Sequence, residues 1–457
     1  MVCEGNFVTD DEPPRTTGRD MLPRVISTLM RPWVLGLLWL MVLAYAVRFV
    51  LFKLPAPPKL GDFGHFYTAA LALRLGSNPY TDKFDALAHS KGVDIGVNHI
   101  SNQTPILLLC IEPLTRLGAR TAYWIWIGIS FASLVFALGL LLFTETSLAL
   151  REMLLFTGLL FIYPPVYELF YFANTQCLIL LLIVAAMYCL RRGWNCWAGL
   201  NLAMATALKA YPWTLALYLA GRRQWGALRW MIIGGAMLGA LTIWSMGPAN
   251  VLSFVGTWGF TNHRQFLAHP DNLSINGFVS RLFWSQGGTS PTRSIDTIRS
   301  VAVITVEVAL FVLTVGASAS VEPDRGWRAL SLWMVAMILL APTAHGHYLI
   351  LLAVPFAAIA DASRRGDVDP RVIYGAIASY LLAFSNYPLS LLQDYHWIGG
   401  ASFRIASEYG FAAAILAYLT AYFFARAKPE TATSSSATGL FPELTKAATS
   451  RSAAHCQ

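Results

Sequence analysis

Long apolar stretches limit what this chain can fold into more than any other feature of its sequence. The first of them, residues 33–52, is about 20 residues long, which is the length an α-helix needs to cross the hydrocarbon core of a membrane. Similar stretches recur as far as residue 424, and only 13% of all residues are charged. A surface exposed to water needs roughly twice that share of charge. We therefore expect an all-α polytopic membrane protein, with about ten to thirteen membrane helices.

Positive charge is concentrated where the apolar stretches end. The net charge is +8, and the basic groups include Arg191-Arg192, Arg222-Arg223, Arg364-Arg365 and Arg426 with Lys428. Cytoplasmic turns of membrane proteins accumulate Lys and Arg, so we interpret this charge as a sign of topology. The alternative, a surface that binds nucleic acid, is disfavoured, and we expect no nucleic-acid partner.

This interpretation divides the chain into three parts. Residues 1–31 form a cytoplasmic N-terminal segment, residues 32–426 form the membrane domain, and residues 427–457 form a Ser/Thr/Ala-rich cytoplasmic tail that we expect to be disordered. Two long polar segments, at about 53–104 and 247–299, then fall on the outer face, away from the basic pairs. The six cysteines form no CxxC pair, so the sequence indicates neither a disulfide framework nor a metal site.

Polar residues that could carry chemistry gather on the predicted outer face. Ionisable residues at the membrane are costly, and broken helices tolerate polar groups only where these line a cavity or pack on protein. The candidates are Asp62, Tyr67, Asn174, Gln176, Lys209, Asn276, Arg281, His345 and His347, with His263, Asp271, Asp394 and His396 in the neighbouring outer segments.

Asp62 is the sharpest of these candidates. It follows the first apolar stretch closely and is flanked by Phe63 and Phe66. Desolvation there would raise its pKa and suit it to act as a general base. The alternative is a structural role as the N-cap of the helix that follows, and one residue could serve both purposes.

The remaining cationic candidates also have two interpretations each. His345 and His347 form an HxH pair without a nearby third ligand, which is weak evidence for zinc. They could bind an anionic phosphate or transfer protons, or they could be polar packing at the interface. Lys209 and Arg281 could pair with phosphate, or extend to the interface to keep their charges in water.

Two architectures fit a polar cluster on one face. One is an enzyme that takes a lipid-linked substrate at the membrane surface, and the other is a lipid or solute transporter with broken helices that meet at the midplane. A structural assembly factor is a third, weaker possibility. The polar groups lie at one face rather than at the midplane, which favours the enzyme.

Six short motifs then resemble, in order, those of glycosyltransferase family 87, whose members are GT-C membrane enzymes that use polyprenyl-phosphate sugars. The motifs are Gly61-Asp62-Phe63 with Tyr67-Thr68-Ala69-Ala70 and Gly76-Ser77-Asn78-Pro79-Tyr80; Pro105 with Glu112-Pro113-Leu114; Asn174-Thr175-Gln176; Lys209-Ala210-Tyr211-Pro212; Asn272-Leu273-Ser274-Ile275-Asn276-Gly277 with Arg281; and Pro342-Thr343-Ala344-His345-Gly346-His347-Tyr348. The resemblance covers about residues 60–390. Thr175 stands where the family usually has glycine.

The resemblance implies a GT-C-like bundle and an inverting sugar transfer. Asp62 would deprotonate an acceptor hydroxyl, which attacks the anomeric carbon of the donor. His345 or His347, with Lys209 and Arg281, would steady the leaving phosphate, and Tyr67, Asn174, Gln176 and Asn276 would line the substrate site. The sugar would be mannose or another hexose, or arabinose.

The resemblance also implies the partners and the location. The donor is a polyprenyl-phosphate sugar, the acceptor is a glycolipid or glycan of the cell envelope, and membrane lipids surround the protein. Neither a cofactor nor a metal ion is expected. The enzyme would reside in the cytoplasmic membrane, with both termini in the cytoplasm and the active site facing the periplasm or the exterior.

Overall fold

The structure of the chain is a computed structural model. It describes residues 27–53, 60–95, 100–260, 267–268, 272–283, 293–322, 325–394 and 400–427, with the side chains of 52–53, 257–260, 293, 385–394 and 400–407 excepted. His263, Asp271, His396 and the side chain of Asp394 therefore lie outside the described part. The predicted cytoplasmic segments 1–31 and 427–457 are described only at residues 27–31 and 427.

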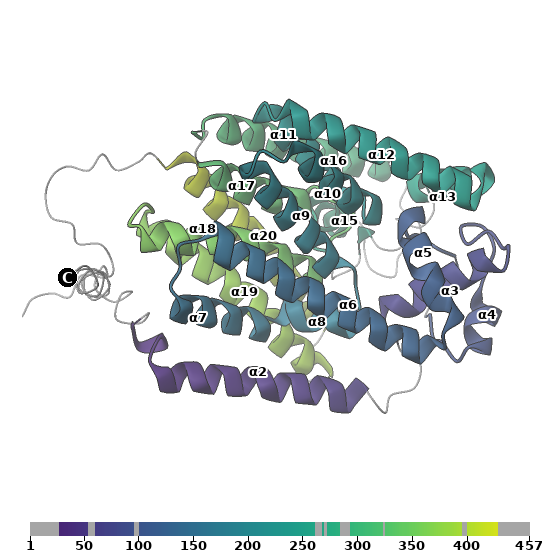
Figure 1. Cartoon of the computed structure of the whole chain (residues 1–457), viewed down its shortest axis with the longest axis horizontal. Helices are drawn as coiled ribbons and strands as arrows, with labels where there is room; N and C mark the ends of the chain where they lie inside the picture. Colours follow the sequence, from purple (N-terminus) through teal and green to yellow (C-terminus); the bar gives the residue numbers. More distant parts are fainter. Residues whose placement is uncertain are drawn as a thin grey trace, which may run out of the picture.

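Every element in the described ranges is a helix (Figure 1), which confirms the predicted all-α class. The helices in chain order are α2 (Pro32–Lys53), α3 (Asp62–Arg74), α4 (Asp85–Ser90), α5 (Pro105–Ile111), η1 (Glu112–Arg116), α6 (Ala119–Gly139), η2 (Leu140–Thr144), α7 (Leu150–Ile162), α8 (Pro164–Phe172), α9 (Gln176–Arg191), α10 (Asn195–Leu208), η3 (Tyr211–Thr214), α11 (Leu215–Gly221), α12 (Trp225–Met246), α13 (Pro248–Phe260), α15 (Ile275–Phe283), α16 (Arg293–Ala319), α17 (Gly326–Leu339), η5 (Gly346–Leu352), α18 (Ala353–Arg364), α19 (Pro370–Asp394) and α20 (Gly400–Arg426).

Six of the described helices are long and apolar enough to cross a membrane, which makes this a multi-pass membrane protein. They are Pro32–Leu51, Ala119–Thr144, Trp225–Met246, Ser294–Ala319, Gly346–Arg364 and Glu408–Arg426. The bent pair α7–α8 is a seventh candidate, and α9, α17 and part of α19 are shorter apolar helices. The expected ten to thirteen membrane helices are approached only when these shorter helices are counted as well.

Proline explains where the shorter helices break. Helices α7 and α8 meet at a bend of 55°, and Tyr163 between them has an extended backbone because Pro164 and Pro165 follow it. The same effect ends α10 ahead of Pro212, where the short helix η3 begins. Breaks of this kind free backbone and polar side chains, and the break at Lys209–Pro212 supplies Lys209, Ala210 and Tyr211 to a cavity.

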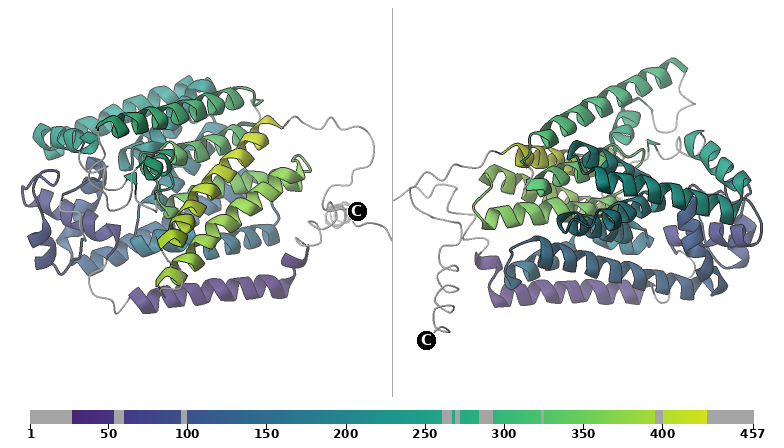
Figure 2. Two further views of the ribbon diagram at one scale, coloured as in Figure 1. Left: turned by 180° about the vertical axis from the view of Figure 1, so that it is seen from behind. Right: turned by 45° about the horizontal axis from the view of Figure 1, so that its top comes forward.

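The helices differ sharply in how deeply they are buried. In an 18-residue window of the span Gly346–Arg364, 89% of the residues are buried. Every residue of α17 from Arg328 to Leu339 is buried as well. Only 11% of the α2 span and 17% of the α16 span are buried, and these two helices lie on opposite outer sides of the bundle (Figures 1 and 2). The buried helices on either side of the histidine pair are therefore at the centre, and the exposed helices α2 and α16 lie on the outside.

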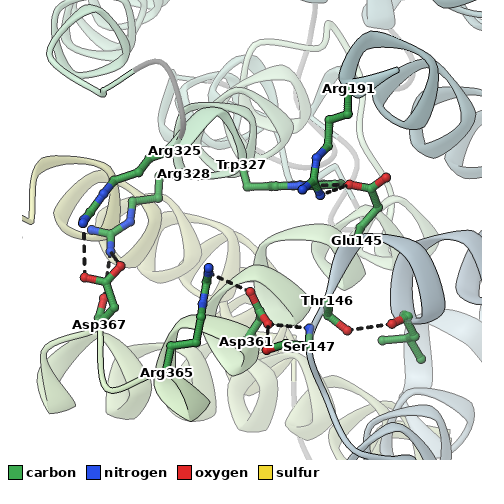
Figure 3. A network of polar contacts seen from close by, with 11 residues as sticks. Glu145, Thr146, Ser147, Arg191, Arg325, Trp327, Arg328, Asp361, Arg365 and Asp367 are labelled. Atoms are coloured by element: carbon green, nitrogen blue, oxygen red, sulfur yellow. Dashed lines mark hydrogen bonds and ion pairs between the residues drawn. The ribbon is translucent and has the colours of Figure 1, made fainter. Parts of the chain in front are cut away.

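The bundle has two ends of different character. At one end, which we call the site end, the short helices α3, α4 and α5 lie together with α13 beside them (Figure 1). At the other end, which we call the basic end, four turns meet: η2–α7, α9–α10, α16–α17 and α18–α19. Figure 3 shows the polar network that joins these turns, through residues such as Glu145, Arg191, Arg328 and Asp361.

Candidate active site

Asp62 is the first residue of α3, and the glycine before it explains its position. Gly61 has a φ of +59°, and a Cβ atom at this residue would lie 2.6 Å from the backbone of Phe172. Only glycine fits such an approach, so Gly61 lets the start of α3 contact the end of α8. The N-cap residue is Gly61 rather than Asp62, and no side chain caps the helix. The prediction that Asp62 could be the N-cap is therefore wrong, and its carboxylate does not cap α3.

The carboxylate of Asp62 accepts a hydrogen bond from the Nδ2 atom of Asn174. The other side of the same amide, Oδ1, accepts hydrogen bonds from the backbone N–H of Thr175 at 2.7 Å and from the Lys209 ammonium at 3.1 Å. Two donors on Oδ1 fix which way the amide faces, because its NH2 group must then point to Asp62. Asn174 thus connects the carboxylate and the ammonium, two oppositely charged groups from separate helices.

The turn that presents Asn174 is built without glycine. Ala173 ends α8 in the left-handed conformation, with φ 52° and ψ 48°, and its carbonyl accepts a hydrogen bond of 2.9 Å from the Trp126 indole. Thr175 has ordinary right-handed angles, with φ −81° and ψ −4°. Replacing the family's usual glycine by Thr175 therefore costs no backbone strain.

Lys209 lies where α10 ends, in an extended conformation that turns its side chain out of the helix. Its ammonium lies 4.3 Å from the centre of the Tyr348 ring, which is a favourable position for a cation. No ion pair of Lys209 occurs among the described residues. The charge is therefore held in place by neutral groups, an amide and an aromatic face, and remains available to an anion.

The two histidines share one segment but differ in exposure. His345 precedes η5 and is half-buried, whereas His347 is 3% exposed. Their rings are nearly parallel with centres 5.7 Å apart, and the His347 ring also lies 6.0 Å from that of Phe172. Neither nitrogen of His347 has a hydrogen-bond partner within the described chain. The His347 ring is therefore held by its aromatic neighbours rather than by hydrogen bonds.

A cavity of about 310 Å³ opens beside these groups. Of the predicted site residues, Asp62, Asn174, Lys209 and His345 line it. The other lining residues are His65, Phe66, Asn102, Gln103, Thr104, Ala210, Tyr211, Trp213, Thr214, Met337, Leu340, Ala341, Pro342, Thr343 and Tyr348. The four predicted residues come from four separate parts of the chain, so the fold does bring them together.

Opposing influences act on the ionisation of Asp62. Burial raises the pKa of this carboxyl, while the nearby Lys209 charge and the hydrogen bond from Asn174 lower it. The net direction is upward from the ordinary value. A raised pKa makes the carboxylate a better proton acceptor, which suits a general base.

Five other predicted site residues do not line the cavity: His347, described above, and Gln176, Tyr67, Arg281 and Asn276. Gln176 is buried and accepts a hydrogen bond of 2.5 Å from the Tyr211 hydroxyl, so it supports a lining residue from behind. The hydroxyl of Tyr67 donates to the carbonyl of Leu117 at 2.8 Å. Neither contact reaches a substrate in the cavity, and both place these side chains in supporting positions.

Arg281 and Asn276 are engaged with other residues. The Arg281 guanidinium binds both carboxylate oxygens of Glu408, at 2.7 and 3.0 Å. The Asn276 amide oxygen accepts from Arg299 at 3.0 Å. Glu408 neutralises the charge of Arg281. The structure therefore gives no support to the expected role of Arg281 at the leaving phosphate.

The sequence reasoning missed what the Asn272–Gly277 motif does. The buried Asn272 side chain accepts a hydrogen bond from the Ala344 N–H at 3.0 Å, and the Leu273 N–H donates to the Ala344 carbonyl at 2.6 Å. A Cβ atom on Gly277 would lie 2.5 Å from Asn272. The motif therefore positions the segment just before His345. Asparagine and glycine at this spacing were the available signal, but their partner is about 70 residues away in the sequence.

The uncharged wall of the cavity was also missed. His65, Asn102, Gln103 and Thr104 line this wall. The sequence places them in the outer segment 53–104, but none of them was predicted as a site residue. The Nε2 of Gln103 donates to the Asn102 amide oxygen at 2.5 Å, and Thr104 donates to the carbonyl of Leu208 at 2.9 Å. These residues precede Pro105, a position that the sequence marks only as a helix start.

Comparison with known families decides between the two architectures. The model of glycosyltransferase family 87 matches residues 104–342, which is just over half of the chain. The chain belongs to glycosyltransferase family 87. The resemblance drawn from the six motifs is thereby confirmed, and the transporter alternative is not favoured. No curated protein sequence matches the chain.

The family 87 match covers only part of the site. Asn174 and Lys209 lie within residues 104–342, whereas Asp62, His345 and His347 lie outside them. The structure nevertheless joins the two groups in one cavity. Among the described residues of this glycosyltransferase, no three His, Cys, Asp or Glu side chains come together as ligands for a metal ion.

Proposed function

We propose that this glycosyltransferase moves a sugar from a polyprenyl-phosphate donor to a hydroxyl of a cell-envelope glycolipid or glycan, with inversion at the anomeric carbon. Mannose is the sugar expected from the family, and another hexose or arabinose is the alternative. The observation that supports this proposal best is the chain of contacts Asp62–Asn174–Lys209 at one cavity wall. It places a proton acceptor and a fixed cation side by side, as the reaction requires.

The proposed step is a single displacement. Asp62 takes the proton of the acceptor hydroxyl while the hydroxyl oxygen attacks the anomeric carbon. The bond from that carbon to the phosphate oxygen breaks, and polyprenyl phosphate leaves with the electron pair. Fixed cations act most strongly where charge develops, so Lys209 and His345 belong on the side of the leaving phosphate.

The uncharged wall then belongs to the acceptor. Because Asn102 uses its amide oxygen to accept from Gln103, its NH2 group remains to donate, and the carbonyl of Gln103 remains to accept. Neither of these groups has another hydrogen bond within the described chain. An adjacent donor and acceptor suit the hydroxyls of a sugar, and they carry no charge that would attract the donor phosphate in their place.

The proposed location is the cytoplasmic membrane, with the site end facing the periplasm or the exterior. This orientation rests on the arginine-rich turns at the basic end, because cytoplasmic turns are enriched in Lys and Arg. Both termini would then be cytoplasmic. A donor in the outer leaflet could present its phosphate to the cavity without crossing the bilayer.

Replacing Asp62 by Asn tests the mechanism directly. The amide keeps the shape of the side chain but cannot accept the proton, and we expect transfer to fall by about 10²–10⁴-fold, the usual contribution of a general base. The measurement is incorporation of labelled sugar from polyprenyl-phosphate donor by the purified protein in detergent. Asp82→Asn is the matched control, because Asp82 is exposed in the same outer segment and bonds the Asn78 backbone outside the cavity.

The outcome can also contradict the proposal. Full activity in the Asp62→Asn variant would exclude Asp62 as the base. Sugar transfer that is retained with a nucleotide donor but absent with a polyprenyl-phosphate donor would exclude the proposed donor class while leaving the family membership intact.

A further inference from the structure

A second cavity, of about 430 Å³, shares no lining residue with the first and lies between α7 on one side and the α18–α19 pair on the other. We call it the slot. Leu29, Met30, Leu148, Glu152, Leu155, Phe156, Leu159, Leu160, Phe356, Ile359, Ala360, Ser363, Arg364, Ile373, Ala376, Ile377, Tyr380 and Leu381 line it. All of these except Glu152, Ser363, Arg364 and Tyr380 are apolar, so the slot offers little to bind water.

The slot runs parallel to the helices that form it. Each helix contributes residues over a range that is eight steps long: Glu152 to Leu160 on α7, Phe356 to Arg364 on α18, and Ile373 to Leu381 on α19. Eight residues of helix rise about 12 Å. One leaflet of the hydrocarbon core is about 15 Å deep. The slot therefore has the depth and the direction of a lipid chain in one leaflet.

Two polar contacts join the walls of the slot. At its basic end, Arg364 forms an ion pair with Glu152. At its inner end, the hydroxyl of Tyr380 donates to the carbonyl of Leu159 at 2.8 Å. Each of them connects α7 to one of the facing helices, so a polar contact marks each end of the slot. A slot framed in this way is a built feature of the fold.

The slot is reached from the membrane. Ile377 and Leu381, on the α19 side, are 42% and 58% exposed. The medium beside a membrane-spanning helix is lipid, so an acyl chain can enter between α7 and α19 without leaving an apolar environment. Occupation by water would require polar partners that the lining does not supply.

The basic end of the slot is suited to an anionic headgroup. Arg364 and Ser363 lie at this end. Arg31 follows the lining residue Met30, and Arg151 precedes the lining residue Glu152; both arginines are exposed and have no side-chain ion pair among the described residues. Basic pockets between membrane helices on the cytoplasmic side bind anionic lipid headgroups. Arg364 itself is paired with Glu152 and marks this end of the slot. We infer that the slot binds one acyl chain of an anionic glycerophospholipid, whose phosphate lies beside Arg31 and Arg151.

The slot is distinct from the place where the donor lipid would bind. Asp62 and Lys209 line the cavity at the site end, whereas the mouth of the slot lies at the basic end, with Arg364. The two polar regions therefore face opposite leaflets. The inference does not depend on the proposed sugar transfer.

Replacing Ala376 by Trp tests the inference. Ala376 is 9% exposed and lines the slot, so the indole ring of a tryptophan at this position would fill it. Tyr374→Trp is the matched control on the same helix, since Tyr374 is 45% exposed and does not line the slot. We expect native mass spectrometry of the purified wild-type protein and the control to show one bound phospholipid. In Ala376→Trp its occupancy should fall about tenfold or more, the change that 1.4 kcal/mol of lost binding produces.

A second measurement covers the case in which Ala376→Trp fails to fold. The wild-type protein is stripped of lipid and its thermal midpoint is recorded with phosphatidylglycerol or with phosphatidylcholine. Binding to the folded state alone raises the midpoint, so phosphatidylglycerol should raise it more, and Arg151→Gln should reduce the difference. Equal effects of the two lipids, retention of lipid by a folded Ala376→Trp variant, or the recovery of a polyprenyl lipid in place of the phospholipid would each overturn the inference.

Discussion

The two ends of this bundle hold their charges in opposite ways. At the basic end, arginines are paired with carboxylates: Arg191 with Glu145, Arg365 with Asp361 at 2.7 Å, and Arg328 with Asp367 at 2.7 Å (Figure 3). At the site end, Lys209 is held by the Asn174 amide and the face of the Tyr348 ring.

This difference separates a structural charge from one that is available to a substrate. An arginine paired with a carboxylate has little net charge left for a ligand, and the basic-end pairs connect turns that are far apart in sequence: Asp361 also accepts from the backbone N–H of Ser147, 214 residues away, at 2.7 Å. Arg281 follows the same rule at the site end, because Glu408 neutralises it. Partners, rather than position alone, therefore distinguish Lys209 from Arg281 and from the paired arginines of the basic end.

Replacing Lys209 by Met gives the largest effect expected from this comparison. The variant keeps the length of the side chain but removes the charge, and loss of one preorganised group that stabilises developing charge costs about 10²–10³ in kcat. Arg191→Met at the basic end is the counterpart, and we expect it to leave kcat unchanged while lowering the thermal midpoint. Steady-state kinetics with the polyprenyl-phosphate donor measure both. A similar loss of kcat in the two variants would break the comparison.

Replacing Asn174 by Asp sharpens the comparison of the two ends, because it tests through the pH dependence of activity whether Asp62 acts as the base. The variant removes the hydrogen bond to Asp62 and places a second carboxyl beside it, and both changes raise the pKa of Asp62. A base must be ionised to work, so activity is lost as pH falls through its pKa, and the acidic limb of the kcat/KM profile should move to higher pH. Asn174→Ala removes the hydrogen bond to Asp62 without adding a carboxyl, and should move the limb less, in the same direction. An unmoved limb in both variants would mean that Asp62 does not titrate as the base.

The sequence predicts the helices, their breaks and the chemistry of the charged site residues, because these depend on local patterns. Apolar length determines a membrane helix, and prolines 164, 165 and 212 coincide with helix breaks. Asp62, Asn174, Lys209 and His345 were predicted because an ionisable or amide group beside an apolar stretch is conspicuous in isolation.

What the sequence could not predict is which polar residue bonds to which. Arg281 and Lys209 are equivalent as cations beside apolar stretches, and only the fold places Glu408 against one and Tyr348 against the other. Asn102 and Gln103 lie in an ordinary polar segment, and only the packing of α5 makes them a cavity wall. Contacts between distant segments set these roles, and no spacing rule within one segment encodes them.

Asn102 provides a smaller test, on the uncharged wall. Replacing it by Ala removes the free NH2 group, and a hydrogen bond worth about 1 kcal/mol should raise the KM for the acceptor roughly fivefold. The KM for the donor should not change, because the phosphate is bound on the opposite wall. Asn201→Ala is the control, since its amide bonds the Trp197 carbonyl on α10, away from the cavity. A rise in the donor KM alone would reverse the assignment of the two walls.

Glu145 tests the basic end with the smallest expected effect. Its carboxylate is 9% exposed and accepts hydrogen bonds from Arg191 and from the Trp327 indole at 3.2 Å. Glu145→Gln keeps an acceptor for the indole but removes the charge, and because Arg191 is 53% exposed water can solvate it once it is unpaired. The loss should therefore be about 1 kcal/mol of folding stability, measured as a lower thermal midpoint in detergent, with kcat intact. If Glu145→Gln instead lowered kcat at an unchanged midpoint, the basic end would have to act on catalysis. An ion pair with a carboxylate would then no longer show that an arginine has a structural role.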